Sequence, residues 1–252
     1  MPQDLILETR GLTKEFRGFL AVRNVDLRVR RGSIHALIGP NGAGKTTVFN
    51  LLTKFHSPTT GKIFFNGTDI TREKPAQIAR RGIVRSFQIS AVFPQLTVLE
   101  NVKIALQRKL GVDHHFWASV ASLQKLDAPG MALLEQVSLA QFSSLLAGDL
   151  PYGRKRTLEI ATTLALDPEL LLLDEPTQGM GHEDVDRIKD LIKRVSVDRT
   201  VLMVEHNMKV VADISDTITV LQRGEVLAEG AYPVVSVDPA VREAYMGTED
   251  DA

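Results

Sequence analysis

Residues 39–46 of the sequence read Gly39-Pro40-Asn41-Gly42-Ala43-Gly44-Lys45-Thr46 and are its most informative segment. It follows an apolar run at residues 36–38 and precedes a helix that we predict over residues 47–52. Glycines let backbone N–H groups curl around an anion, and a helix N-terminus adds unpaired N–H groups with partial positive charge. This pattern between a strand and a helix predicts a phosphate-binding loop, in which Lys45 reaches the β- and γ-phosphates and the Thr46 hydroxyl binds Mg²⁺.

The composition narrows the class of protein. The 252 residues include 30 Lys and Arg against 31 Asp and Glu, so the basic excess typical of nucleic-acid binders is missing and we expect no nucleic-acid partner. Cysteine is absent, which leaves no disulfide framework and no thiolate metal site and fits a reducing compartment. The first residues lack a signal-peptide pattern and no apolar run is long enough to span a bilayer. We therefore expect any membrane role to come through a partner.

Hydrophobic patterning predicts an α/β fold. Alternating apolar and polar residues favour antiparallel strands at 5–8, 25–29 and 62–67, and continuous apolar runs favour buried parallel strands at 170–174 and 200–204. Helical spacing occupies 76–81, most of 92–146 and 183–196, and a hairpin is predicted over 217–228. We predict a single domain with a nucleotide-binding core (1–91 and 161–252) that includes an antiparallel β subdomain and is interrupted by a helical subdomain (92–160).

Acidic and imidazole side chains follow the two buried strands. Asp174 ends the first strand, where a carboxylate can hold Mg²⁺, and Glu175 can orient or deprotonate an attacking water. The alternative is an ordinary acidic turn before Pro176. His206 follows the second strand and can bond a γ-phosphate, whereas a lone His is more often structural. The phosphate loop upstream and the strand-end positions favour the functional interpretations.

Two further features are weaker on their own. Gln88 follows a predicted strand at 83–87, and its amide can bind Mg²⁺ and water, although a solvated Gln is the default. Arg154, Lys155 and Arg156 gather at the start of a helix predicted to run from residue 150 to about 166. Cations there oppose the helix dipole by about 0.3–1 kcal/mol each, so an anion or acidic partner nearby is expected. Charge on a solvated helix face is the alternative.

Together these motifs, in this order over residues 4–247, resemble the ATP-binding subunit of ABC transporters. The resemblance implies a P-loop NTPase (RecA-like) core and makes 39–46 the Walker A loop, Gln88 the Q-loop, 150–154 the signature motif, 170–174 Walker B, 179–181 the D-loop and His206 the switch histidine. Phe16 stands where the family stacks an aromatic on adenine, or it is a strand core residue.

The resemblance also implies an ATPase that uses ATP and Mg²⁺, with a role for each matched residue. It implies that the catalytic residues are Glu175, His206, Lys45 and Gln88, and that the metal ligands are Thr46, Gln88 and Asp174. The nucleotide would be bound by Phe16, Gly39, Pro40, Asn41, Gly42, Ala43, Gly44, Lys45, Thr46, Thr47, Gly153 and Arg154.

Within the family, the chain is similar to the ATPases of branched-chain and other hydrophobic amino acid importers. The resemblance lies in residues 39–50, 85–88, 152–153, 158–161, 204–209 and 244–247. ATPases for urea, amide and lipopolysaccharide transport look similar, so they stay as alternatives, as do ABC ATPases without a transport role and a nucleotide-binding regulator that hydrolyses little ATP.

Two motifs depart from the family pattern. The usual signature is Leu-Ser-Gly-Gly-Gln, but here Pro151 and Tyr152 replace its serine and first glycine, and Arg154 replaces its glutamine. Gly181 stands where the D-loop usually carries an aspartate. A hydrogen bond to a charged group is worth about 1.5–3 kcal/mol, so the missing serine hydroxyl predicts a weaker composite site rather than lost activity.

The resemblance finally implies partners and a location. Two ATPase chains, the same or sisters, would sandwich two ATP molecules, each between the 39–46 loop of one chain and the 150–154 segment of the other. A permease helix would dock just after Gln88, and a periplasmic solute-binding protein would act indirectly. The chain would lie peripherally on the cytoplasmic face of the plasma (inner) membrane.

Overall fold

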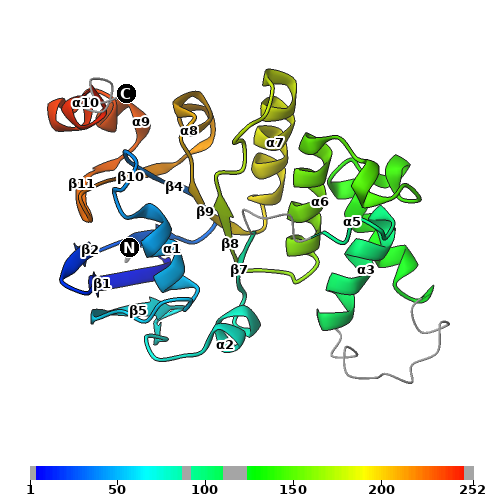
Figure 1. Ribbon diagram of the computed structural model, residues 1–252, viewed down its shortest axis with the longest axis horizontal. Helices are drawn as coiled ribbons and strands as arrows, with labels where there is room; N and C mark the ends of the chain where they lie inside the picture. Colours follow the sequence, from blue (N-terminus) through cyan, green and yellow to red (C-terminus); the bar gives the residue numbers. More distant parts are fainter. Residues whose placement is uncertain (1–3, 87–91, 110–123, 247–252) are drawn as a thin grey trace.

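A computed structural model describes residues 4–86, 92–109 and 124–246, which form two β-sheets and a set of helices (Figure 1). The first sheet is antiparallel and has the order β2-β1-β5-β6, with β3 pairing to β1. Its strands are β1 (Leu5–Phe16), β2 (Phe19–Val25), β3 (Arg28–Arg30), β5 (Thr60–Phe65) and β6 (Thr68–Asp69).

The second sheet carries the candidate site and has the order β11-β10-β4-β9-β8-β7. Its strands are β4 (Ile34–Ile38), β7 (Ile83–Arg85), β8 (Leu170–Asp174), β9 (Thr200–Val204), β10 (Thr217–Gln222) and β11 (Glu225–Gly230). All neighbours in this sheet are parallel except β10 and β11, which form the predicted hairpin. The loops after β4, β8 and β9 therefore leave the sheet at the same edge.

Helices cover the second sheet and extend to one side of it. They are α1 (Lys45–Leu52), α2 (Pro75–Arg80), α3 (Val98–Lys109), α5 (Asp127–Gln136), α6 (Tyr152–Leu164), α7 (His182–Val195), α8 (Met208–Ile214), α9 (Tyr232–Val235) and α10 (Pro239–Met246), with short 3₁₀ turns at Ala140–Phe142 and Ala147–Asp149. Helices α3, α5 and α6 pack together at the end of the molecule opposite β1 and β2 (Figure 1). Within the described part of the chain, no helix combines the length and the apolar character that crossing a membrane requires.

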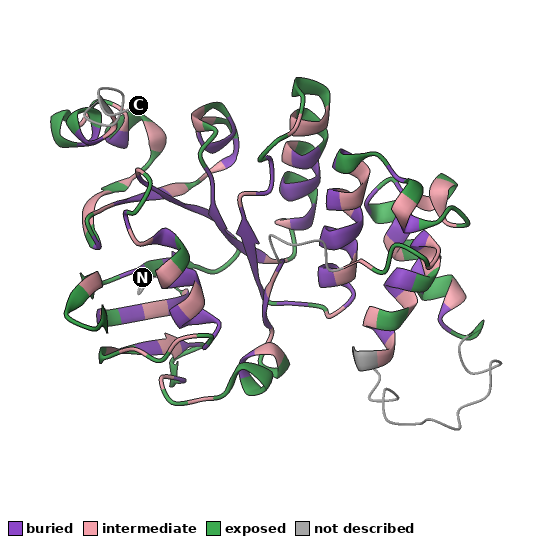
Figure 2. Ribbon diagram, viewed as in Figure 1, coloured by how far each residue is buried: buried purple, intermediate pink, exposed green. Residues whose placement is uncertain are grey.

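The central strands are buried on both faces, as their continuous apolar runs predict (Figure 2). Leu170 and Leu172 of β8 pack with α1 and the antiparallel sheet, whereas Leu171 and Leu173 pack with α6 and α7. The parallel strands predicted at 170–174 and 200–204 are confirmed with the same bounds. Two apolar layers thus hold the strand ends that carry the candidate site.

The prediction of one continuous strand over residues 25–29 is wrong. The strand conformation is interrupted at residues 26 and 27, between β2 and β3. The Thr9 hydroxyl donates to the Val25 carbonyl and accepts from the Leu27 N–H, both at 2.8 Å. Thr9 itself is 1% exposed. A buried hydroxyl thus occupies the backbone groups that would otherwise continue one strand, and β1 pairs with two separate partners instead.

Candidate active site

The phosphate loop fits tightly against neighbouring strands. Gly39, at the end of β4, has φ of 149°, and a Cβ there would lie 2.1 Å from the Leu221 carbonyl oxygen. Gly44 has φ of 103°, and its Cβ would lie 2.6 Å from the Ala21 carbonyl oxygen. Side chains at either position would clash with backbone, so the loop requires glycine at both.

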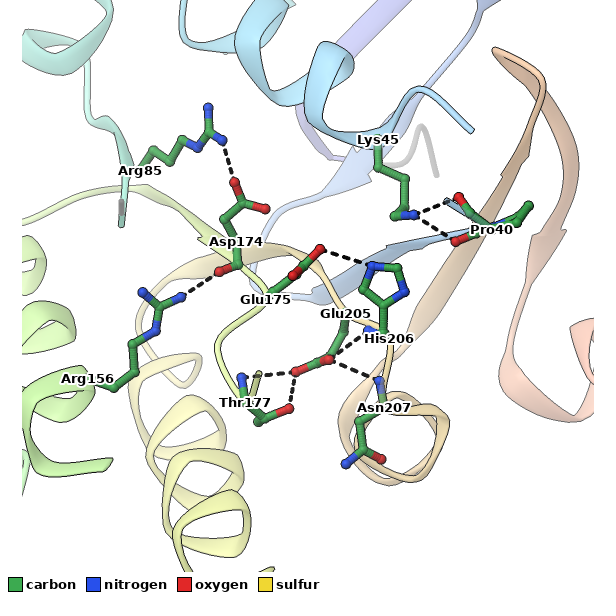
Figure 3. A network of polar contacts seen from close by, with 11 residues as sticks. Pro40, Lys45, Arg85, Arg156, Asp174, Glu175, Thr177, Glu205, His206 and Asn207 are labelled. Carbon is green, nitrogen blue, oxygen red and sulfur yellow. Dashed lines mark hydrogen bonds and ion pairs between the residues drawn. The ribbon is translucent and has the colours of Figure 1, made fainter. Parts of the chain in front are cut away.

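Lys45 opens α1 and turns its amine into this loop (Figure 3). Its Nζ donates to the carbonyl oxygens of Gly39 at 2.7 Å and Pro40 at 2.9 Å. Burial lowers the pKa of Lys45, while the nearby carboxylates of Glu175 and Asp174 act in the opposite direction. A cation thus lies at the loop, next to the acidic end of β8, while Thr46 beside it is exposed.

Asp174, the last residue of β8, is 1% exposed, and its two oxygens differ. Oδ2 pairs with Arg85, while Oδ1 is buried without a hydrogen-bond partner among the described residues (Figure 3). An unpartnered carboxylate oxygen suits Mg²⁺, which commonly takes one or two carboxylates and completes its shell with phosphate oxygens and water. Among the described residues, no cluster of three or more His, Cys, Asp or Glu side chains is placed to hold a metal. The predicted ligand Gln88 lies outside the described residues.

Glu175 and His206 meet although they follow different strands. His206 Nε2 lies 2.9 Å from Glu175 Oε1, and both side chains line a cavity of about 540 Å³ that Asn41 of the phosphate loop also lines (Figure 3). Glu175 has φ of 46°, a left-handed conformation that is unusual for a non-glycine residue and is found preferentially at functional sites. The structure therefore brings together the predicted base, the predicted γ-phosphate ligand and the phosphate loop.

The signature segment lies in another cavity, of about 310 Å³, which shares no lining residue with the first. Gly153 packs against α7, and a Cβ at this glycine would lie 2.4 Å from Asp184 Cγ. The Arg154 guanidinium lies 4.1 Å from the centre of the Phe142 ring. Because residue 153 has no side chain, the Asp184 carboxylate can lie close to the start of α6.

For Arg156 the expected acidic partner is a residue of the same chain, Glu159, and the alternative of charge on a solvated helix face is wrong. Arg156 is 6% exposed, pairs with Glu159 at 2.8 Å and donates to the Asp174 carbonyl oxygen. Its charge supports the end of β8 from inside the molecule. The helical position of Arg156 gave no sign of this contact, because the contact depends on how α6 packs against the sheet.

Phe16 ends β1 and is 38% exposed, so the alternative of a strand core residue is wrong. Its ring lies edge-on to His56, with ring centres 5.1 Å apart, and 4.9 Å from Lys14 Nζ. Stacking on adenine stays a prediction.

Sequence reasoning missed Arg85, Glu205 and Thr177 as parts of this site. Arg85 pairs with Asp174, and Glu205, 2% exposed, contacts Thr177, His206 and Asn207 (Figure 3). Only their positions in the sequence could have pointed to them, because Arg85 lies three residues before Gln88 and Glu205 directly precedes His206.

Comparison with known proteins shows which family this chain is similar to. A sequence model of the family described as ABC transporter matches residues 22–178, and one described as branched-chain amino acid ATP-binding cassette transporter matches residues 225–251. The high-affinity branched-chain amino acid transport ATP-binding protein BraF of Pseudomonas aeruginosa is 41% identical over 251 residues, which cover 96% of this chain and 98% of BraF.

Solved structures agree with the sequence comparison. The ADP conformation of MJ1267, an ATP-binding cassette of an ABC transporter, superposes with a TM-score of 0.84 at 29% identity, covering 96% of this chain and 99% of MJ1267. The dimeric structure of MJ0796, a bacterial ABC transporter cassette, superposes with a TM-score of 0.75 at 25% identity, covering 89% of this chain and 98% of MJ0796.

Proposed function

Because this chain belongs to the ABC transporter family of ATP-binding proteins, we propose that its ATP hydrolysis powers the import of branched-chain or other hydrophobic amino acids. The observation that carries the proposed mechanism is the contact between Glu175 and His206, beside Asp174 and the phosphate loop. Similarity to BraF and the match of residues 225–251 support the choice of solute.

Each residue has a defined part in the proposed reaction. Lys45 and the N–H groups of the phosphate loop bind the β- and γ-phosphates, and His206 holds the γ-phosphate. Glu175 orients the attacking water or accepts its proton, in line with the departing ADP oxygen. Thr46, Gln88 and Asp174 would hold Mg²⁺, which would supply positive charge to the phosphate oxygens.

The proposed site is completed by a second ATPase chain, the same or a sister. The cavity at Gly153 and Arg154 is separate from the one at Glu175 and His206, which supports a signature segment that serves the partner's nucleotide. The dimeric form of MJ0796 supports the same assembly. Permease subunits would bind this pair at the cytoplasmic face of the plasma membrane, near Gln88, and a periplasmic protein would deliver the solute. The division into a core and a helical subdomain at 92–160 belongs to the same proposal.

The test replaces the proposed base. Glu175→Gln keeps size and removes the charge, so ATP binding is retained while turnover falls by about 10²–10⁴-fold. The matched control is Glu183→Gln on α7, where the side chain is 81% exposed. ATPase activity is measured on the purified chain, and leucine uptake in cells that depend on this chain. Near-normal hydrolysis by Glu175→Gln would contradict the mechanism, and hydrolysis without leucine uptake by the unaltered chain would contradict the solute.

A further inference from the structure

Glu205 is a buried carboxylate whose hydrogen bonds all reach backbone or side-chain donors of two catalytic loops. Its Oε1 accepts from the Thr177 N–H at 3.1 Å and from the Thr177 hydroxyl. Its Oε2 accepts from the N–H groups of His206 at 2.7 Å and Asn207 at 3.0 Å (Figure 3). A carboxylate offers about four acceptor positions and no donor, so these four donors match it fully.

The two loops joined in this way carry the two side chains of the proposed reaction. Thr177 lies two residues after Glu175, and the chain between them leaves β8 through the left-handed conformation of Glu175. His206 directly follows Glu205 at the end of β9. Asn207 then caps α8, because its side chain accepts from the N–H groups of Lys209 and Val210. One buried group thus contacts both loops beneath the Glu175–His206 pair.

We propose that Glu205 is a positioning residue for ATP hydrolysis, which holds the loop of Glu175 and the loop of His206 at the spacing that catalysis requires. This inference rests on the roles proposed above for Glu175 and His206. A strained turn persists only where its surroundings fix it, and Glu205 together with the bond from the Glu175 N–H to the Val204 carbonyl, 2.9 Å, fixes this one.

The carboxylate is needed because an amide of the same shape cannot satisfy the four donors. In Glu205→Gln, the new NH₂ group has to face either Thr177 or the N–H pair of His206 and Asn207. The Thr177 hydroxyl can rotate to accept, but the Thr177 N–H then loses its partner. The spacing of the two loops is therefore loosened while the phosphate loop, on β4 and α1, keeps its own contacts.

The first experiment compares steady-state hydrolysis by the purified full-length chain and its Glu205→Gln variant. Loss of a hydrogen bond to a charged group predicts a fall in kcat of about 10- to 100-fold. The KM for ATP stays within about twofold, since nucleotide binding does not use Glu205. Glu135→Gln, at an exposed position of α5, is the matched control and keeps the original kcat. A kcat for Glu205→Gln within twofold of the original overturns the proposal.

The second experiment separates positioning from general stability by a cycle of substitutions. If Glu205 acts through Glu175 and His206, then adding Glu205→Gln to a background with both Glu175→Gln and His206→Gln lowers the residual rate by less than about twofold. A loss of the same factor in both backgrounds overturns the proposal. Full activity of Glu175→Gln alone instead refutes the proposed function, so the two failures are distinct.

If Glu205→Gln does not fold, Thr177 provides the test. Thr177→Val removes the hydroxyl contact and Thr177→Ser keeps it, so kcat of the Val variant is expected to be about 3- to 10-fold lower than that of the Ser variant. Equal rates for the Val and Ser variants overturn the proposal.

Discussion

At the scale of single residues, Arg85 decides how Asp174 is presented. Its guanidinium donates to Asp174 Oδ2 and to Asn50 Oδ1, the latter at 2.7 Å, and so joins β7, β8 and α1. The two side chains of the ion pair are 10% and 1% exposed. With Oδ2 engaged, Oδ1 is the oxygen left for a metal.

Removal of Arg85 is expected to destabilise the fold. Arg85→Ala leaves the Asp174 charge buried without its partner, which typically lowers the free energy of unfolding by about 3–5 kcal/mol. The measurement is urea unfolding of the purified chain. Arg10→Ala, which breaks the exposed pair with Glu8, is the matched control and should change the free energy of unfolding far less, because solvent screens an exposed pair. Equal effects of the two substitutions would contradict the role of Arg85.

At the scale of elements, a chain of hydrogen bonds crosses three neighbouring strands, from buried His35 and Thr219 to the exposed Glu229. His35 Nε2 of β4 lies 2.8 Å from the Thr219 hydroxyl of β10, which donates to Glu229 of β11 at 2.7 Å. Because the hydroxyl donates to Glu229, it accepts from His35, so we infer the neutral ring with its proton on Nε2. Nδ1 is buried and without a hydrogen-bond partner among the described residues. Burial, helped by Arg30, lowers the pKa of His35 to about 4.

This depressed pKa predicts a loss of stability in acid. Between pH 6.5 and about 4 the unfolded chain binds the proton at residue 35 and the folded chain does not. The neutral His35 ring therefore makes its full contribution to the free energy of unfolding above pH 6.5, and this contribution is lost as the pH falls through this range. In urea unfolding at pH 7 and pH 4.5, the original chain should lose roughly 2–3 kcal/mol more than His35→Gln, whose amide can still donate to Thr219. Equal losses in both proteins would refute the prediction.

At the scale of the whole molecule, the cavity at Glu175 and His206 is separate from the cavity at Gly153 and Arg154. The six-stranded sheet holds Lys45, Asp174, Glu175 and His206 along one edge, while Gly153 and Arg154 lie in the cavity between α6 and α7. In the proposed sandwich each of these two cavities would be half of an ATP site, completed by the other chain across a two-fold axis.

Mixed dimers test this arrangement. Lys45→Ala disables the phosphate loop. Gly153→Ala disturbs the signature segment, because the new Cβ would lie against Asp184 of α7. A dimer with one chain of each kind has one site without any substitution, so an equimolar, co-expressed mixture should hydrolyse ATP faster than either variant alone. The control mixture of Lys45→Ala with Glu175→Gln has no intact site. Rates equal to those of the control would contradict the shared site, provided that thermal unfolding shows Gly153→Ala to be folded.

Local patterns of residues in the sequence were enough to predict the central strands and the phosphate loop. The strands at 170–174 and 200–204 follow from runs of apolar residues, because a strand buried on both faces needs no polar alternation. The phosphate loop follows from glycines whose backbone conformations other residues avoid. The strand-end positions of Asp174, Glu175 and His206 also follow from this pattern, whereas their roles stay predictions and Gln88 lies outside the described residues.

Only the tertiary structure decided what the polar side chains contact. Arg85 and Asp174 are 89 residues apart and Thr177 and Glu205 are 28 apart, and they meet because β8 lies between β7 and β9. The burial of Arg156, the exposure of Phe16 and the break between β2 and β3 have the same origin. Apolar burial is written into each segment, whereas a hydrogen bond requires a particular partner, and the partner is supplied by the order in which distant segments pack.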